Sequence, residues 1–343
     1  MGTKNLLAEA FWAVLPAQPG LALRAILPTA DKTAQDDLIE ASGLSLENIP
    51  NGSDRFDVFV AIRQLRPKQW IKNALLFLPI VASHTTDPLA WSKAVLAFIV
   101  FSLLASAIYV LNDLLDLKAD RAHPLKQNRP IASGALSIPH AVRLFLVLLV
   151  AAFLGALALG EEFSAIALIY LVLTTIYSFG LKAVKTIDIA MLAGLFSIRV
   201  IAGAAATDLP ASLWFLAFTA PAFLSLATVK RLTEVTRATH SGPVPGRAYS
   251  QSDRAWLLLL ATLAAATSVA VFVAYSFSPA AVALYEATSV FRWAALPLSI
   301  WLGRMIYSSW KGTQGYDPIS HALRDYLGLF MVICSAGLIF AAI

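Results

Sequence analysis

The chain consists of long apolar stretches that alternate with short polar connections. Nine stretches approach the roughly 20 apolar residues that a helix needs to cross a hydrocarbon core about 30 Å thick. They lie at about 69–84, 91–113, 138–159, 163–181, 187–206, 211–231, 255–276, 289–309 and 323–343. Their apolar residues run continuously, which argues against a transmembrane β-barrel, whose strands alternate. The pattern predicts an all-α polytopic membrane protein with about nine transmembrane helices.

Three places depart from this simple pattern. The first stretch, 69–84, is short and polar at its start. The sixth contains Pro221, and a proline inside a helix removes a backbone hydrogen bond and can kink the helix. Residues 277–288 are expected to form a short re-entrant or interfacial segment.

Composition agrees with a membrane protein. Of the 343 residues, 58% are hydrophobic and 14% are charged, whereas soluble domains are about 45–50% apolar and about 25% charged. An ordinary soluble enzyme and a disordered chain are therefore excluded. The single cysteine, Cys334, excludes an intrachain disulfide and a cysteine-based zinc site. The first 25 residues lack the pattern of a cleavable signal peptide, so none is predicted.

Lysine and arginine residues lie mostly in one set of connections. Those before the first stretch and in the 2–3, 4–5, 6–7 and 8–9 connections, with their flanks, are Arg63, Arg66, Lys68, Lys72, Lys118, Arg121, Lys126, Arg129, Arg143, Lys182, Lys185, Lys230, Arg231, Arg237, Arg247, Arg254, Arg304, Lys311 and Arg324. The opposite connections hold Lys93 and Arg292. Basic loops stay in the cytoplasm, so this side is predicted to be cytoplasmic. Topology thus explains the net charge of +5 better than nucleic-acid binding does.

The composition also divides the chain. Residues 1–60 contain several acidic residues and the turn-like Pro50-Asn51-Gly52. We expect them to form a cytoplasmic amphipathic extension of unknown role, followed by a transmembrane catalytic domain over 61–343.

An acidic cluster marks the cytoplasmic end of the second stretch. Asn112, Asp116 and Asp120 follow one another at four-residue intervals, which places them on one face of a helix. Asp113 lies roughly 100° around the same helix. Carboxylate and amide oxygens suit Mg²⁺, which binds one or two protein carboxylates and completes its shell with water and substrate phosphates. The cluster Asn112, Asp113, Asp116 and Asp120 therefore predicts a Mg²⁺-diphosphate site.

A basic loop follows the acidic cluster directly. Arg121, Lys126 and Arg129 supply the positive charge that phosphate oxygens need, and Pro124 and Pro130 stiffen the loop. The alternative is a solvated helix end with salt bridges from the acidic side chains to neighbouring basic residues. Four groups in register ahead of a basic loop favour the metal-phosphate interpretation.

The motifs together carry a family resemblance. They are Arg66-Pro67-x-Gln69-Trp70-x-Lys72-Asn73, Asn112-Asp113-x-x-Asp116-x-x-x-Asp120-Arg121, His123-Pro124-x-Lys126, Arg129-Pro130-Ile131-Ala132-x-Gly134, Tyr177-x-Phe179-Gly180-Leu181-Lys182, Arg199-x-Ile201-Ala202-Gly203, Lys230-Arg231-x-x-Glu234 and Ala322-Leu323-Arg324-Asp325. From about residue 60 onward, the chain resembles the UbiA superfamily of membrane prenyltransferases. Within that superfamily it is most similar to the decaprenyl-phosphate phosphoribosyltransferase branch. The resemblance implies a UbiA-like bundle with a polar active-site cap in the cytoplasm.

One motif departs from the typical pattern. Prenyltransferases of the superfamily carry a second aspartate-rich motif in the 6–7 connection, where this chain reads Lys230-Arg231-Leu232-Thr233-Glu234. One acid is kept and two cations are added. The resemblance therefore implies a second cradle that accepts an anionic monophosphate rather than another metal ion.

The resemblance also implies a reaction. A phosphoribosyltransferase of the bacterial inner membrane would move 5-phosphoribose from 5-phosphoribosyl-1-diphosphate to a polyprenyl phosphate, in synthesis of a cell-wall arabinose donor. Asp113, Asp116 and Asp120 with Asn112 would hold Mg²⁺ on the donor diphosphate. Further candidates for substrate contact are Lys72, Asn73, Arg121, Lys126, Arg129, Tyr177, Lys182, Asp188, Arg199, Lys230, Arg231 and Glu234. Among them, Lys182, Lys230 and Arg231 would bind the lipid phosphate or the ribose 5-phosphate.

Asp188 and Arg199 are intramembrane charges. They are eleven residues apart and so share a helix face. Charges inside a span usually face the bundle interior and are often functional. The alternative for Arg199 is pairing with polar groups of neighbouring helices.

Two other functions remain as alternatives. A conventional prenyltransferase would bind a polyprenyl diphosphate at the aspartates and alkylate an aromatic or other small acceptor. A transporter for a phosphorylated solute would carry its charged sites near the midplane, whereas the charges here gather at one membrane face. The expected partners are the two substrates and the membrane, with no nucleic acid, and self-association is left open.

Overall fold

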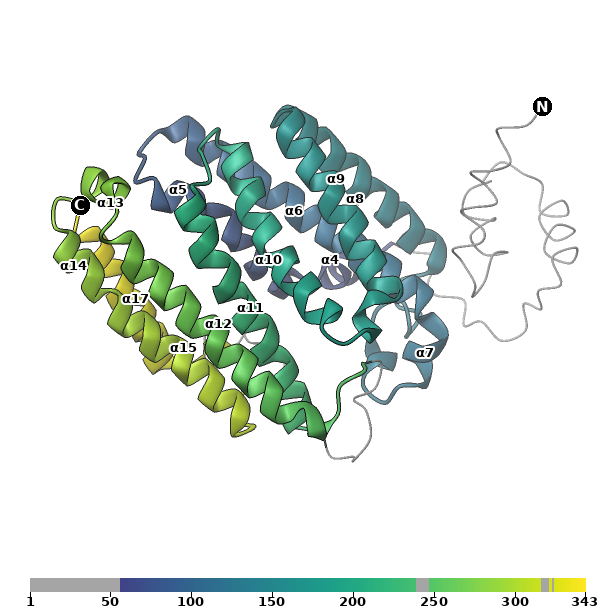
Figure 1. The fold of residues 1–343 in the computed structure, drawn as a ribbon. Helices are drawn as coiled ribbons and strands as arrows, with labels where there is room; N and C mark the ends of the chain where they lie inside the picture. Colours follow the sequence, from purple (N-terminus) through teal and green to yellow (C-terminus); the bar gives the residue numbers. More distant parts are fainter. Residues whose placement is uncertain (1–55, 239–246, 316–320, 323) are drawn as a thin grey trace, which may run out of the picture. The chain divides into compact units, whose positions relative to one another are not determined.

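The structure is a computed structural model that describes residues 56–238, 247–315, 321–322 and 324–343. Over these residues every regular element is a helix (Figure 1). The expected extension over residues 1–60 lies almost wholly outside the described residues. The chain forms two compact units, one of Met1–Asn73 and Val95–Ser164 and the other of Ala74–Ala94 and Ala165–Ile343. Each unit is described by itself.

The first unit contains most of the second expected span and the third. Its elements are α4 (Val58–Leu65), the start of the 3-10 helix η1 (Pro67–Phe77), most of α6 (Pro88–Leu115), α7 (Leu117–Ala122), η2 (Lys126–Asn128), α8 (Ile138–Ala158) and the first residues of α9 (Glu161–Phe179). Asp57 caps the start of α4, because its carboxylate accepts hydrogen bonds from the backbone N–H groups of Phe59 and Val60.

Packing of α8 on α6 forms the core of the first unit. A Cβ added at Gly155 of α8 would lie 2.7 Å from a methyl carbon of Val100 on α6, so this glycine permits a close approach of the two helices. Towards the polar end of α6, Ala107 and Val110 pack in one cluster with Ile131 and Leu136 of the loop before α8. The loop that carries the basic residues is therefore anchored by buried apolar side chains.

The second unit is a helical bundle arranged around α11. Its elements are α5 (Leu78–Ala82), most of α9, η3 (Leu181–Ala183), α10 (Ile187–Ala206), α11 (Leu213–Thr236), η4 (Gln251–Asp253), α12 (Arg254–Tyr275), α13 (Pro279–Leu284), α14 (Thr288–Trp293), α15 (Ala295–Trp310) and α17 (Tyr326–Phe340). In this bundle α11 packs against α10, α12 and α15, and α17 packs against α15 (Figure 1).

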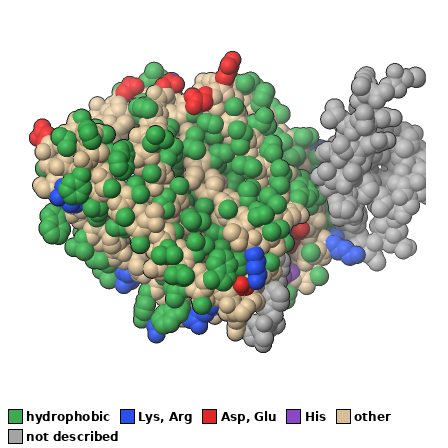
Figure 2. Space-filling model, in the orientation of Figure 1, with side chains coloured by type: hydrophobic (Ala, Val, Ile, Leu, Met, Phe, Trp, Pro, Cys, Tyr) green, Lys and Arg blue, Asp and Glu red, His purple; other side chains and the backbone are tan. Residues whose placement is uncertain are grey.

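Small residues and hydroxyl groups join the helices of this bundle. Ser225 of α11 donates a hydrogen bond to the carbonyl of Ala261 on α12 at 2.9 Å. Ser268 of α12 donates to the carbonyl of Phe218 on α11, also at 2.9 Å. Such contacts replace the hydrophobic effect that drives helix association in water. Figure 2 shows that hydrophobic side chains dominate the surface over α12 and α15, as expected for helices that face lipid.

A close backbone approach in the second unit lies at Gly203. A Cβ added to this α10 residue would lie 2.1 Å from the carbonyl oxygen of Leu76, a distance that real Cβ atoms do not show. Only glycine therefore lets the end of η1 lie directly against α10.

Six helices of the described residues are long and apolar enough to cross a membrane: Pro88–Leu115, Ile138–Ala158, Glu161–Phe179, Ile187–Ala206, Leu213–Thr236 and Gln251–Tyr275. They correspond to the second through seventh expected spans. The sixth span runs through Pro221 as one helix.

The other three expected spans occur as shorter elements. The first consists of η1 and then α5, with Pro79 at the start of α5. The eighth is divided into α14 and α15, and the ninth is the 15-residue helix α17. Residues 277–288 contain the short helix α13. A count of nine spans thus remains a prediction.

Candidate active site

The acidic motif of the first unit lies where α6 gives way to α7. Helical backbone bonds continue through the junction, with Asp116 N–H donating to the Asn112 carbonyl and Asp120 N–H to the Asp116 carbonyl, both at 2.8 Å. Asp113 and Asp120 are seven residues apart, close to two full turns, and both are buried. Asp116 is exposed, and Asn112 is half-buried.

Arg129 joins the two buried carboxylates. Its Nη1 atom lies 3.0 Å from Asp113 Oδ1 and 2.5 Å from Asp120 Oδ2. Lys126 Nζ lies 3.7 Å from the other oxygen of Asp120. The acidic helix end and the basic loop thus lie together in one cluster. It pairs Asp113 with Asp120, whereas the spacing had suggested Asn112, Asp116 and Asp120 as the common face.

Two residues that the sequence analysis did not select also hold Asp113. Gln64 Nε2 donates to Asp113 Oδ2 at 2.9 Å, and Arg66 Nη2 lies 2.7 Å from both oxygens. Arg66 opens a motif of the family resemblance, so its sequence context gave one signal. Gln64 precedes every recognised motif, so its sequence context gave no signal.

The oxygen atoms of this cluster fit a divalent cation in part. No group of three or more histidine, cysteine or acidic side chains converges as a metal cage among the described residues. Within the same part of the chain, Asp120 Oδ1 is buried and accepts no hydrogen bond. Asp116 is exposed next to it in the motif. Mg²⁺ commonly takes one or two protein carboxylates, and Asp116 and Asp120 are the candidates for these positions.

The remaining candidates of the first unit make local contacts. Lys72 Nζ donates to Gln69 at 2.7 Å, and buried Asn73 donates to Ser102 at 3.1 Å. Arg121 Nε donates to the carbonyl of Ala132 at 3.1 Å, which ties α7 to the loop before α8. Arg121 therefore has a structural contact in addition to its predicted role at phosphate.

A second polar cluster lies in the second unit, at the end of α11. Arg231 and Asp188 are both fully buried. Arg231 donates through Nε to Asp188 Oδ2 and through Nη2 to Asp188 Oδ1, and its Nη1 lies 2.5 Å from Glu234. The Tyr177 hydroxyl donates to Asp188 at 2.9 Å and accepts from Arg231 at 3.0 Å. Four residues predicted separately as site candidates thus meet in one network.

Arg247 completes this network and was not selected from the sequence. Its Nη1 atom donates to Asp188 Oδ1, to the Tyr177 hydroxyl and to the carbonyl of Lys182, at 3.0 to 3.2 Å. It lies in the long connection after α11, without a recognised motif around it. Lys182 and Lys230 are half-buried in η3 and α11. The cluster therefore gathers cationic side chains around two carboxylates.

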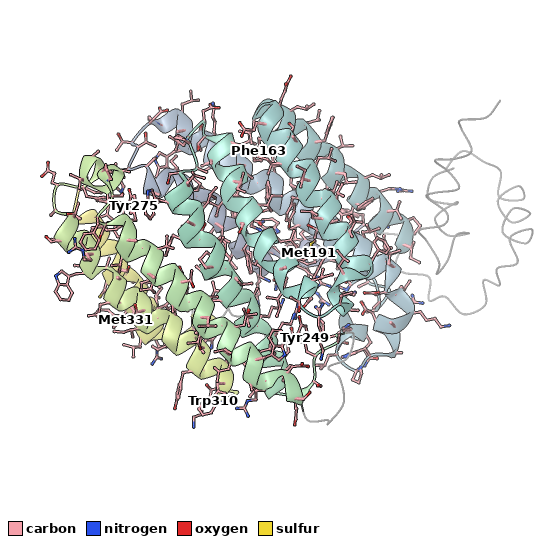
Figure 3. The ribbon with its side chains drawn as sticks, in the orientation of Figure 1. Phe163, Met191, Tyr249, Tyr275, Trp310 and Met331 are labelled. Carbon is pink, nitrogen blue, oxygen red and sulfur yellow. The ribbon has the colours of Figure 1, made fainter. Side chains whose placement is uncertain are left out.

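The turn before Asp188 is strained. Thr186 has a φ of 69°, which is uncommon for a β-branched residue. Its N–H donates to the hydroxyl of Tyr249 at 3.0 Å (Tyr249 is labelled in Figure 3). Burial raises the pKa of Tyr249 above its ordinary value, so this hydroxyl stays protonated at neutral pH. Strained backbone that its surroundings hold in place is frequent at functional sites.

Arg199 does not join Asp188, although both belong to α10. Three helical turns separate them by roughly 16 Å. Arg199 donates to the hydroxyl of Tyr170 at 2.9 Å and to the carbonyl of Leu195, and its guanidinium lies 4.9 Å from the centre of the Tyr170 ring. These contacts match the alternative in which Arg199 pairs with neighbouring helices.

The comparison with family models decides the family. The model of the UbiA prenyltransferase family matches residues 74–317. The chain belongs to this family. Family membership and the six apolar helices of the described residues make it a multi-pass membrane protein, and membership confirms the expectation of an enzyme of the transferase class.

Curated relatives of this UbiA family chain carry several names. It is 35% identical to the nodulation protein NoeC of Azorhizobium caulinodans, over 80% of this chain and 91% of that protein. It is 33% identical to the decaprenyl-phosphate phosphoribosyltransferase of Mycobacterium tuberculosis strain H37Rv, over 77% of this chain and 87% of that one. With the uncharacterized protein y4nM of Sinorhizobium fredii the identity is 36%, and the match spans 79% of this chain and 53% of y4nM.

A solved structure supports the fold. A UbiA homolog from Archaeoglobus fulgidus, bound to GPP and Mg²⁺, aligns with a TM-score of 0.61 at 18% identity. The alignment covers 82% of this chain and 99% of that one. The UbiA-like bundle expected from the motifs is therefore confirmed.

Proposed function

We propose that this UbiA family enzyme transfers 5-phosphoribose from 5-phosphoribosyl-1-diphosphate to a polyprenyl phosphate and releases diphosphate. One observation carries the choice of reaction: at the end of α11, buried Arg231 stands where the resemblance to conventional prenyltransferases predicts a second acidic motif. Both nearby carboxylates, Asp188 and Glu234, are already paired with this guanidinium. The names of the mycobacterial relatives support the same reaction.

The second cluster suits a monophosphate better than a metal ion. Arg231 and Arg247 pair with the carboxylates of Asp188 and Glu234. Lys182 accepts from Arg247 through its carbonyl, and Lys230 precedes Arg231 in the chain, so four basic residues stand beside two acidic ones. The excess of positive charge favours an anion, and arginine N–H groups bind phosphate oxygens in pairs. We propose that this cluster holds the lipid phosphate or the ribose 5-phosphate, and that the tight Asp188 pairing fixes the guanidinium orientation.

The first cluster suits the donor diphosphate. Asp116 and Asp120, with Asn112, would hold Mg²⁺, which would neutralise charge on the diphosphate as it leaves. Lys126 and Arg129 supply N–H donors for the same phosphates. The choice of Mg²⁺ rests on the chemistry of these oxygen ligands and is part of the proposal.

The chemistry asks little of the protein beyond positioning and charge. An oxygen of the lipid phosphate attacks C1 of the ribose while the bond from C1 to the diphosphate oxygen breaks, and the diphosphate leaves with the bonding electrons. A phosphate monoester is ionised near neutral pH, so no general base is needed. Each cluster would bind and orient the anion proposed for it, and the apolar surface of the helices would take the isoprenoid chain.

We also propose the location and the use of the product. The excess of basic residues in alternate connections supports a cytoplasmic active site in a bacterial inner membrane. A product of this kind suits a cell-envelope arabinose donor. The name of the relative NoeC suggests nodulation as a second process in which the product is used.

A radiolabel transfer assay tests the reaction. Protein purified in detergent receives ribose-labelled phosphoribosyl diphosphate, a polyprenyl phosphate and Mg²⁺, with EDTA in the control. We expect label in the organic phase only when Mg²⁺ is present. Failure to transfer, in a preparation that alkylates an aromatic acceptor with a polyprenyl diphosphate, would establish the conventional prenyltransferase instead.

A further inference from the structure

Asp113 accepts hydrogen bonds from three side chains on two sides. Gln64 and Arg66 approach from the end of α4, and Arg129 approaches from the basic loop. The carboxylate is 3% exposed, and both of its oxygens lie 2.7 Å from Arg66 Nη2. To bind a metal ion, Asp113 would have to give up at least one charge-assisted hydrogen bond, which is among the strongest contacts of its kind.

The backbone at Arg66 is held in an unusual conformation. Arg66 has φ 54° and ψ 58°, in the left-handed region, and it precedes Pro67. A residue before proline disfavours helical conformations, and a side chain disfavours positive φ. Two contacts fix the turn: Ser106 Oγ donates to the Leu65 carbonyl at 2.9 Å, and the Arg66 guanidinium lies 5.1 Å from the centre of the Tyr109 ring. The strain is therefore maintained by packing on α6.

Both guanidinium groups keep unused donors. Within the described part of the chain, the side-chain hydrogen bonds of Arg66 use Nη2 and those of Arg129 use Nη1. A guanidinium carries five N–H donors. The side chains of Arg66 and Arg129 are 29% and 26% exposed, so part of each group reaches the surface of the unit. Asp113 thus holds one edge of each guanidinium and leaves other donors for a ligand.

Two acceptor atoms near this carboxylate are unsatisfied. Gln64 Oε1 and Asp120 Oδ1 are buried and accept no hydrogen bond from the residues that the structure describes, and Asp120 Oδ1 has only the longer 3.7 Å contact with Lys126 Nζ. Gln64 itself is fully buried, and Asp120 is joined to Asp113 through Arg129. A buried oxygen without a hydrogen bond is destabilising. Such oxygens are expected where a bound ligand or ion completes the site.

We propose that the acidic residues of the first cluster have two different roles. Asp113, positioned by Gln64, is an anchor that holds Arg66 and Arg129 as a preformed site for a diphosphate, and it does not ligate the metal. Asp120, with Asp116, is the metal-binding pair. This assignment rests on the proposed function for the identity of the diphosphate, and it changes the sequence-based prediction, which gave all three aspartates to the metal.

Two binding measurements separate the anchor from the metal ligands. The first is calorimetric titration of inorganic diphosphate into detergent-purified protein in EDTA. The second is electron paramagnetic resonance of Mn²⁺ at saturating diphosphate. Each is applied to Asp113→Asn, Arg66→Gln, Gln64→Leu and Asp120→Asn, with Asp208→Asn and Arg143→Gln as exposed controls. Unfolding temperatures select the variants that remain folded.

We expect the variants to fall into two groups, one that loses diphosphate affinity and one that loses Mn²⁺ binding. Asp113→Asn and Arg66→Gln should weaken metal-free diphosphate binding about tenfold or more, because each removes charge-assisted contacts, and Mn²⁺ should still bind. Gln64→Leu should weaken it roughly threefold to tenfold, because the lost donor is neutral. Asp120→Asn should lose Mn²⁺ instead.

Loss of Mn²⁺ from a folded Asp113→Asn protein would overturn the proposal, since an anchor does not touch the metal. If that variant does not fold, Arg66→Gln decides: unchanged diphosphate affinity would overturn it. Neither assay contains ribose or lipid. A wild-type protein that binds both probes but transfers no phosphoribose would contradict the proposed reaction and leave this assignment standing.

Discussion

Arg231 of α11 and Asp188 of α10 are both fully buried, and two nitrogens of the guanidinium donate to the two oxygens of the carboxylate. Burying such a pair removes both charges from water. This free-energy cost is offset only when the geometry of the pair is good and further hydrogen bonds are made to it. Here Tyr177 and Arg247 provide those extra bonds to Asp188. The pair therefore joins two helices of the second unit and orients a cation at the same time.

We expect Asp188→Asn to destabilise the protein by about 3 to 5 kcal/mol, because it leaves the buried guanidinium with less compensation. Apparent unfolding temperature in detergent measures this. Asp208→Asn is the matched control, since Asp208 is exposed in its pair with Lys93. The double change Asp188→Leu with Arg231→Met should recover part of the loss. Equal unfolding temperatures for Asp188→Asn and the wild type would contradict a stabilising pair.

Asp116→Asn should abolish transfer while leaving the fold intact. Asp116 is exposed, and its side chain caps no helix, so its loss should not move the unfolding temperature. The proposed metal ion would lose a carboxylate ligand, and we expect turnover to fall by at least about a hundredfold. The radiolabel assay measures the rate. Retained turnover would remove Asp116 from the reaction.

Arg247→Gln tests a residue that no motif identified. Arg247 donates to Asp188, Tyr177 and the Lys182 carbonyl and is half-buried. Its loss should raise the KM for one phosphate substrate about tenfold, because charge-assisted hydrogen bonds are worth about 1.5–3 kcal/mol. Steady-state kinetics with each substrate varied in turn shows which one. Arg143→Gln, an exposed change on α8, should leave both KM values unaltered.

Much of the fold follows from the sequence because long apolar stretches are a strong signal. The expected stretch 187–206 coincides with α10, and 138–159 differs from α8 by one residue. The first stretch was less regular than expected. Pro79 lacks an N–H donor and cannot continue the bonding of a helix through this position, and residues 67–82 form a 3-10 helix followed by a short α-helix instead of one span.

The candidate site was predicted by its motifs and missed where contacts are distant in sequence. Asp113, Asp120 and Arg129 were found because they lie close together along the chain. Gln64 is 49 residues from Asp113, and Arg247 is 59 residues from Asp188. Helical periodicity holds no information about such pairs. The pairing of Arg199 with Tyr170 instead of Asp188 was hidden for the same reason.

Gly203 offers a test of packing within a single helix. A methyl group there would collide with the Leu76 carbonyl, whereas one at Gly194 of the same helix would meet nothing within 4 Å. We therefore expect Gly203→Ala to lower the unfolding temperature strongly and Gly194→Ala to leave it unchanged or slightly higher. Expression level and thermal unfolding in detergent check both. Equal behaviour of the two variants would contradict the close approach.

The contact of Gly203 with Leu76 also bears on the order in which the chain assembles. Residues 74–94 belong to the same compact unit as residues 165–343, yet they are synthesised about a hundred residues earlier. The surface of α10 at Gly203, against which Leu76 lies, does not exist until α10 has been synthesised. Residues 74–94 are therefore synthesised before the helix against which they pack. Docking of residues 74–94 onto α10 is therefore a late step in the assembly of this unit.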